Sequence, residues 1–297
     1  MKIGIVGPIC RDLKIIGTEQ AEQTGGVTYY TGEALHSLGV ETTVFGSYSS
    51  QDMPYSKDFG FSLIHIGAEG TIKFSNIQTN PNDPDRRVQE AYAPNNRITT
   101  NDIPIDKLQK LDYVIFGPLV HDNISALTIQ EIARRVKDNG TKLVLASQGM
   151  FRYLEGKSIE KRNPENLCKA LSYVDYVFFD DEELKFVSEK TDIKEGVNLL
   201  RDTYGATNVI VTQGSDGSKY FTGRSCYTFD AFKTASIVDT VGAGDSYMAG
   251  FLKAQELSED PYYWMKFASM TATMSIERKG AFDGSLENVL GRIEIAA

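Results

Sequence analysis

The sequence predicts an α/β fold built around a mainly parallel β-sheet. Short apolar runs alternate along the chain with longer segments of helical periodicity. The runs are continuous rather than alternating, which is typical of parallel strands covered by helices on both faces. The chain has 297 residues, enough for one large α/β domain or two medium ones. We expect one domain over residues 1–297.

The apolar runs give the strands of this sheet. They are Lys2–Val6, Thr42–Phe45, Tyr113–Phe116, Lys142–Ala146, Tyr176–Phe179 and Asn208–Thr212. Helical patterns lie between and after them, at Ile124–Lys137, Asp181–Glu189, Lys194–Tyr204, Ala243–Leu257 and Tyr262–Arg278. Strand–helix alternation implies right-handed crossovers, and these make neighbouring strands parallel.

One segment, from Phe61 to Ala93, departs from this alternation of strands and helices. Residues 71–77 alternate between apolar and polar, residues 80–85 are rich in turn formers, and a second strand follows at Arg87–Tyr92. This pattern predicts a β-hairpin. Two interpretations stay open: a decoration at the sheet edge, or a small β lid over a ligand cleft. We place the lid at about residues 13–25 and 61–97.

Composition excludes several classes of protein. Forty acidic residues against 31 basic ones give a net charge of −9, which argues against a nucleic-acid partner. No run of about 18 apolar residues is present, so no membrane span or membrane partner is expected. The start of the chain does not resemble a signal peptide. The three cysteines are far apart and odd in number, which favours a reducing, cytoplasmic location without disulfides.

The strongest local motif is the stretch 239–245, which leads into the first turn of the helix predicted at Ala243–Leu257. Gly242, Ala243 and Gly244 allow a ligand to approach the backbone closely, and amides at a helix N-terminus favour an anion. Asp245 lies within the first helical turn. There it either stabilises the helix dipole or acts as a general base facing the same anion. The second arrangement suits phosphoryl transfer to a hydroxyl group.

Two other nucleotide-binding motifs fail on spacing. Gly156-Lys157-Ser158 is similar to the end of a P-loop. A P-loop also requires a glycine five residues earlier, and that position is occupied by Phe151. Gly242-x-Gly244 opens a dinucleotide fingerprint, but Tyr247 occupies the third glycine position.

The stretch Asp239-Thr240-Val241-Gly242-Ala243-Gly244-Asp245 resembles the C-terminal motif of the ribokinase-like (phosphofructokinase B type) carbohydrate kinases. Further segments match in the expected order over nearly the whole chain. The resemblance implies a three-layer α/β/α fold with a small β-sheet lid. It also implies transfer of the γ-phosphoryl group of ATP to a hydroxymethyl group of a small sugar, polyol or nucleoside. Asp245 would then be the base, and Gly242, Ala243 and Gly244 the anion hole.

The resemblance also assigns residues to the phosphoryl acceptor. They are Asp12, Gly25, Gly26, Tyr30, Gln148 and Arg152. Asp12 matches an aspartate that holds substrate hydroxyls, although an aspartate after a strand is also a common turn residue. The paired glycines match the hinge between lid and core. Tyr30 stands where the family often has Asn, and Ala146 replaces an aspartate found in some members near Gln148.

A third set is implied for the nucleotide and the cations. Thr212, Gly214 and Gly217 match the segment that contacts ATP, Glu183 and Asp180 would hold Mg²⁺ through water, and Asp239 and Gly280 match a monovalent-cation site, often occupied by K⁺. Asp180 replaces the usual Asn and adds negative charge unless a metal balances it. An acidic helix N-terminus is the simpler explanation of the same residues.

A second interpretation is a catalytically weak nucleotide- or sugar-binding regulatory protein on the same fold. Tyr30, Ala146 and Asp180 motivate it, whereas the retained Asp245 and its glycine loop favour the kinase. The acceptor stays open among fructose, ribose, inositol and nucleosides. A homodimer formed through exposed lid strands is a further expectation.

Overall fold

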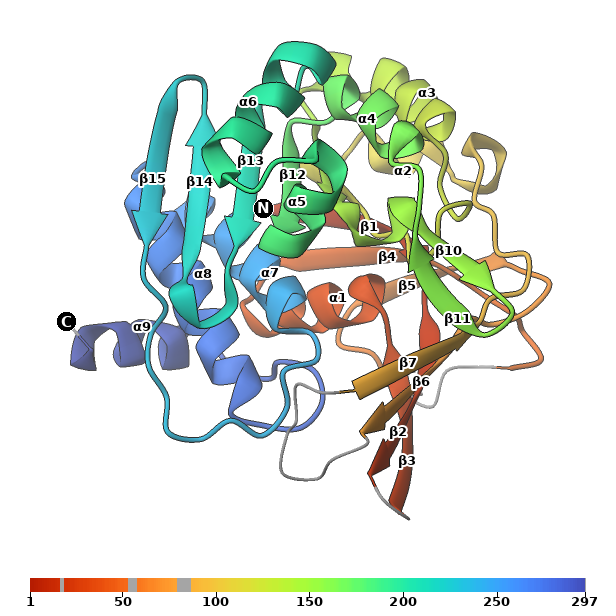
Figure 1. Ribbon diagram of the computed structural model, residues 1–297, viewed down its shortest axis with the longest axis horizontal. Helices are drawn as coiled ribbons and strands as arrows, with labels where there is room; N and C mark the ends of the chain where they lie inside the picture. The colour runs from red at the N-terminus through yellow and green to blue at the C-terminus, as the bar shows by residue number, and fades with distance from the viewer. Residues whose placement is uncertain (17–18, 53–57, 79–86, 297) are drawn as a thin grey trace.

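A mainly parallel sheet runs through the middle of the protein (Figure 1). The structure is a computed structural model that describes residues 1–16, 19–52, 58–78 and 87–296. Within these residues the sheet has nine strands. In spatial order they are β15 (Ser225–Phe229), β14 (Ser218–Thr222), β13 (Asn208–Thr212), β12 (Tyr176–Asp180), β9 (Lys142–Ala146), β8 (Tyr113–Phe116), β1 (Lys2–Pro8), β4 (Glu41–Tyr48) and β5 (Ser62–Gly67). Every pairing from β13 to β5 is parallel, and only β14 and β15 pair antiparallel. The predicted sheet is confirmed.

Each central strand divides its side chains between two hydrophobic cores. In β8, Tyr113 and Ile115 enter one core, and Val114 and Phe116 enter the other. Four helices close the first core: α1 (Val27–Ser37), α7 (Ala243–Leu257), α8 (Pro261–Ile276) and α9 (Leu286–Ile295). Five close the second: α2 (Ile105–Leu108), α3 (Ala126–Val136), α4 (Glu165–Ala170), α5 (Asp181–Ser188) and α6 (Ile193–Tyr204). The result is the expected three-layer α/β/α arrangement.

A smaller six-stranded sheet projects from one side of the larger one (Figure 1). Its order is β10 (Arg152–Glu155), β11 (Ser158–Lys161), β7 (Arg87–Tyr92), β6 (Lys73–Gln78), β2 (Cys10–Ile16) and β3 (Glu19–Gly25). The predicted hairpin is β6 and β7, which pair antiparallel with Asn76 opposite Gln89. The turn-rich stretch 80–85 lies outside the described residues.

The small sheet differs in two respects from the expected segments 13–25 and 61–97. Strand β5 falls within the second range but pairs in parallel with β4, so it extends the large sheet. The hairpin of β10 and β11 joins the small sheet through β7, although its residues lie outside both ranges. Its turn contains Gly156 at a φ of 62°, a left-handed conformation that favours glycine.

The chain passes between the two sheets near the carboxyl ends of the parallel strands. A single residue, Ile9, separates β1 from β2. The return is equally short, because β3 ends at Gly25 and Gly26 begins α1 as its N-cap with a φ of 95°. Ligands of open α/β sheets bind in the crevice outside the carboxyl ends of the strands. In this protein the small sheet stands beside that crevice.

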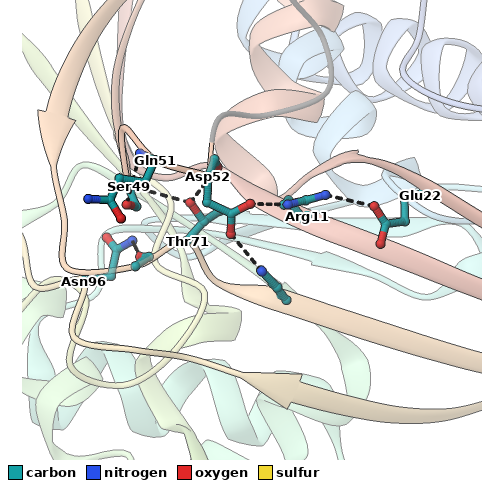
Figure 2. A network of polar contacts seen from close by, with 9 residues as sticks. Arg11, Glu22, Ser49, Gln51, Asp52, Thr71 and Asn96 are labelled. Atoms are coloured by element: carbon teal, nitrogen blue, oxygen red, sulfur yellow. Dashed lines mark hydrogen bonds and ion pairs between the residues drawn. The ribbon is translucent and has the colours of Figure 1, made fainter.

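A polar network ties the small sheet to the segment after β4 (Figure 2). Arg11 and Lys73 are register partners on β2 and β6, so two positive charges lie side by side. The Asp52 carboxylate contacts both, with Lys73 Nζ 2.8 Å from Oδ2. Thr71 Oγ1 donates to the Asp52 carbonyl at 3.0 Å. Burial opposes ionisation of Asp52, but hydrogen bonds from Lys73 and Arg11 outweigh it and hold its pKa below the ordinary value.

None of the helices in the described parts of the chain combines the length and apolarity needed to cross a bilayer.

The network predicts a pH-dependent stability. Asp52→Asn should lower the free energy of unfolding by about 1–2 kcal/mol at neutral pH, because two cations lose their shared partner. A carboxyl with a depressed folded-state pKa contributes stability above its unfolded pKa and loses it as the pH falls through the folded value. Urea unfolding should therefore show the gap between wild type and variant closing below about pH 4.

The exposed Asp138 provides the control, since Asp138→Asn should leave stability nearly unchanged at every pH. A gap for Asp52→Asn that stays constant from neutral to acidic pH would contradict the role of this network.

Candidate active site

A cavity of about 930 Å³ lies at the carboxyl ends of β1, β9, β12 and β13, with residues of the small sheet along one wall. Most of the residues predicted for the site line it: Asp12, Gly26, Tyr30, Gln148, Arg152, Asp180, Glu183, Thr212, Gly214, Gly217, Gly242, Ala243, Gly244 and Asp245. Gly25, Asp239 and Gly280 are not among its lining residues. The structure thus brings the three predicted sets of residues to a single hollow.

The first turn of α7 presents backbone amides that no side chain caps among the described residues. The N-cap is Gly242, whose φ of 80° is left-handed. The Ala243 amide donates to the Thr240 carbonyl at 3.3 Å, so it is partly satisfied. The amides of Gly244 and Asp245 belong to the first turn and have no carbonyl partner one turn earlier in the helix. These two amides are therefore the better anion donors, and of the predicted Gly242, Ala243 and Gly244 only Gly244 is among them.

Two independent constraints require glycine at position 242. Its positive φ strains any residue with a Cβ. A Cβ would also lie 2.7 Å from the ring of Tyr30. A Cβ at Gly244, in contrast, would meet no atom within 4 Å. Gly242 is held against α1, and Gly244 faces open space.

Asp245 lines the cavity and is half-buried. Burial raises its pKa to about 7; the positive charge of Arg152 lowers the pKa, and the negative charges of Glu183 and Asp12 raise it further. A carboxyl that titrates near neutral pH can accept a proton and release it again. The surroundings of Asp245 are therefore compatible with general-base chemistry.

Glu183 and Asp180 form a reciprocal cap at the start of α5. The Glu183 amide donates to Asp180 Oδ1 at 2.6 Å, and the Asp180 amide donates to Glu183 Oε2 at 3.1 Å. Ser147 Oγ donates to the same Glu183 oxygen at 3.0 Å. Burial and the Asp180 charge raise the pKa of Glu183 to about 7, against the lowering effect of Arg152. The pair therefore stabilises the helix, as the simpler explanation expected.

The same pair fits Mg²⁺ as well. Mg²⁺ is usually bound by one or two carboxylates together with waters and substrate phosphates, not by a full protein cage. Asp180 is exposed at the cavity with Glu183 beside it. No cluster of three or more ligating side chains occurs in the residues that the structure describes. Two carboxylates of this kind could share a magnesium ion with waters and substrate phosphates.

The Asp12 carboxylate also lines the cavity, and its charge contributes to the raised pKa of Asp245. It is buried, and Cys10 Sγ lies 3.3 Å from Asp12 Oδ1 as a donor. Burial, together with the charges of Asp12 and Asp245, raises the pKa of the Cys10 thiol. A Cβ at Gly25 would lie 2.1 Å from Asp12 Oδ2. Gly25 thus leaves the space that the Asp12 side chain fills, although it does not line the cavity.

Tyr30 lines the cavity and its ring lies against Gly242 at the start of α7. Its hydroxyl oxygen accepts a hydrogen bond from Gln23 Nε2 at 2.9 Å. Burial and then the Asp12 charge raise the pKa of the phenol, which stays neutral. The hydroxyl proton can then be donated to a ligand.

Several lining residues were not predicted from the sequence. Phe74 and Asn76 of β6 and Gln89 of β7 contribute to the wall, and Gln89 Nε2 donates to Asn76 Oδ1 at 2.9 Å. Alternation along β6 places residues 74 and 76 on one face, but it does not say that this face meets the cavity. Phe232 and Lys233 also line the cavity and lie in an irregular segment without any periodic pattern.

Three further predicted residues, Gly217, Gly280 and Asp239, lie in turns or loops of the structure. Gly217 has a φ of 91°, and a Cβ there would lie 2.1 Å from the Phe229 carbonyl oxygen, so it shapes the turn after β13. Gly280 also has a positive φ, in a turn after α8. Asp239 is buried, and its Oδ1 accepts the Val241 amide at 3.2 Å.

The contrast between the two glycines yields a prediction. Gly242→Ala should lower the free energy of unfolding by about 2–4 kcal/mol, through backbone strain and overlap with Tyr30. Gly244→Ala is the matched control and should change stability by less than about 1 kcal/mol, because the new methyl group meets open space in a helix. Chemical denaturation measures both. Equal losses at the two positions would contradict the packing of Tyr30 on Gly242.

Residues 71–288 match the pfkB family of carbohydrate kinases. The chain is 34% identical over 242 residues to 1-phosphofructokinase of Borreliella burgdorferi, covering 77% of this chain and 73% of that enzyme. It is 34% identical over 121 residues to fructosamine kinase FrlD of Bacillus subtilis, covering 41% of this chain and only 40% of the relative.

The fold has close counterparts among solved structures. A sulfate complex of a pyrophosphate-dependent kinase in the ribokinase family superposes with a TM-score of 0.82 at 22% identity, over 97% of this chain and 99% of the other. At this identity the likeness concerns the fold. Together with the match over residues 71–288, it shows that the chain belongs to the pfkB family of carbohydrate kinases and has the ribokinase fold.

Proposed function

We propose that the protein is an ATP-dependent kinase that phosphorylates a hydroxymethyl group of a small sugar, polyol or nucleoside. One observation carries the proposal: the Asp245 carboxylate and the uncapped first turn of α7 line the same cavity. Membership of a carbohydrate kinase family supports it. When a hydroxyl group attacks phosphorus, the hydroxyl must lose a proton and the transferred phosphoryl group carries negative charge. A carboxylate and free amides in one cavity can serve these two needs.

In the proposed reaction, Asp12 binds hydroxyl groups of the acceptor, with Tyr30 and Gln148 beside it. The reacting hydroxyl gives its proton to Asp245 while its oxygen forms a bond to the γ-phosphorus of ATP. The bond from that phosphorus to the bridging oxygen breaks, and ADP leaves with the electron pair. The amides of Gly244 and Asp245 hold the charge of the transferred group.

Arg152 and the acidic pair of α5 complete the proposed electrostatics. The positive charge of Arg152 lowers the pKa of both Asp245 and Glu183, so it acts on the proposed base and on the proposed magnesium ligand. It would pair with a phosphoryl oxygen or an anionic group of the acceptor. Bound Mg²⁺, held by Glu183 and Asp180 through water, would neutralise charge on the phosphates.

The small sheet is proposed to act as a lid within one domain spanning residues 1–297. Asp12, Phe74, Asn76 and Gln89 reach the cavity from its strands. Closing this wall would exclude water, so that the phosphoryl group passes to the acceptor rather than to solvent. ATP would lie toward Thr212, Gly214 and Gly217. A cytoplasmic location stays a prediction, which rests on the three free cysteines. A homodimer formed through the lid also stays a prediction.

An ADP-release assay with Mg²⁺, ATP and a panel of sugars, polyols and nucleosides tests the proposal. Asp245→Asn should lower kcat by on the order of 10²- to 10⁴-fold while ATP affinity stays within about twofold of wild type. For wild type, kcat/KM should rise with pH and level off above about 7, because only the ionised carboxylate accepts the proton.

The exposed Asp202 supplies the control, and Asp202→Asn should match wild type in rate and pH profile. Retained turnover in Asp245→Asn would refute the base assignment. Saturable nucleotide binding without ADP release for any acceptor would favour the regulatory protein instead. With pyrophosphate in place of ATP the leaving group is orthophosphate, so release of orthophosphate instead of ADP tests the donor.

A further inference from the structure

A lysine of the small sheet reaches the loop that leads into α7. Lys14 lies on β2 two residues after Asp12, so both side chains leave the same face of the strand. Lys14 Nζ lies 3.1 Å from Asp239 Oδ2. The Asp239 side chain is 7% exposed and that of Lys14 is 28% exposed. The ion pair therefore joins the small sheet to a buried carboxylate in the loop before α7.

Asp239 is fixed on its other sides. Its Oδ1 accepts the Val241 amide, and its own amide donates to the Ile276 carbonyl at 3.2 Å, at the end of α8. Val241 directly precedes Gly242, the N-cap of α7. The carboxylate thus holds the loop that presents the anion-binding amides. An unpaired negative charge there would be costly to bury and would repel an incoming phosphate.

Resemblance to the carbohydrate kinases implied a monovalent cation at Asp239. The donor set does not fit that ion, because the lysine ammonium already takes the outward carboxylate oxygen and the backbone amide takes the other. One ammonium also neutralises one carboxylate, which leaves no net charge to attract a second cation. Gly280, the other residue expected at the cation, does not line the cavity.

We propose that the Lys14 ammonium serves at Asp239 in place of a monovalent cation. Lys14 is then a positioning residue that acts through Asp239 on the α7 loop. Because it belongs to the small sheet, the charge at Asp239 is neutralised when the sheet lies over the cavity. Lid position and the electrostatics of the anion-binding loop are coupled through this one contact. The activity part of the test below rests on the proposed kinase function.

The experiment compares K⁺ with tetramethylammonium at constant ionic strength, with two readouts: ADP release and the midpoint of thermal unfolding. Wild type should show the same turnover and the same midpoint in both salts. Lys14→Met should lose turnover about tenfold in tetramethylammonium, because a buried carboxylate is left unpaired. Potassium should restore part of that turnover and should raise the midpoint of this variant only.

Two further variants separate charge from fold. Lys14→Arg keeps the positive charge and should behave as wild type in both salts. Lys161→Met removes an exposed lysine from β11 of the same sheet and should also match wild type. If Lys14→Met does not fold, the wild-type comparison and Lys14→Arg still decide the proposal.

Severalfold activation of wild type by K⁺, or a potassium-dependent midpoint in wild type, would overturn it. So would a Lys14→Met protein whose turnover falls but is not restored by K⁺, since Lys14 would then act on the substrate. If no acceptor is phosphorylated, the kinase proposal fails, while the unfolding midpoints still test the role of Lys14.

Discussion

The site depends on one constraint: an α-helix must begin in the cavity without a side chain to cap it. Gly242 meets that constraint because it adopts a left-handed conformation against the Tyr30 ring and offers no capping oxygen. The amides that follow are left for an anion. Asp245 lies on the same turn, where burial keeps its pKa near neutrality. The same few residues therefore position the proposed anion donors and the proposed base.

The larger fold supplies the surroundings that this turn needs. Parallel strands bring the segments after β1, β9, β12 and β13 to one edge of the sheet. The small sheet is attached to that edge at Ile9 and at Gly25-Gly26, so its inner face meets the same crevice. Besides apolar contacts with the first core through Phe74 and Ala91, it makes ionic contacts through Asp52 on one side and Asp239 on the other. Contacts of this kind can break and form again when a lid moves.

Periodicity predicted the fold well where the pattern was strong. All six apolar runs are strands of the large sheet, and the β6–β7 hairpin was predicted because its alternation is clear. Strand β5 was assigned to the wrong sheet, since a half-buried edge strand has the same pattern as a lid strand. The motif at 239–245 identified the α7 loop. Neighbours such as Lys14 and Asn76 could not be predicted, because their roles depend on contacts between segments distant in the sequence.

The central claim is that the first-turn amides of α7 receive the phosphate of the donor. Amide NMR shifts during titration with a non-hydrolysable ATP analogue and Mg²⁺ test it directly. The account predicts that the amide protons of Gly244 and Asp245 move downfield together as the analogue saturates, since hydrogen bonds to an anion deshield the proton. Saturation with shifts confined to the Thr212 side of the cavity, and none at residues 244 and 245, would contradict it.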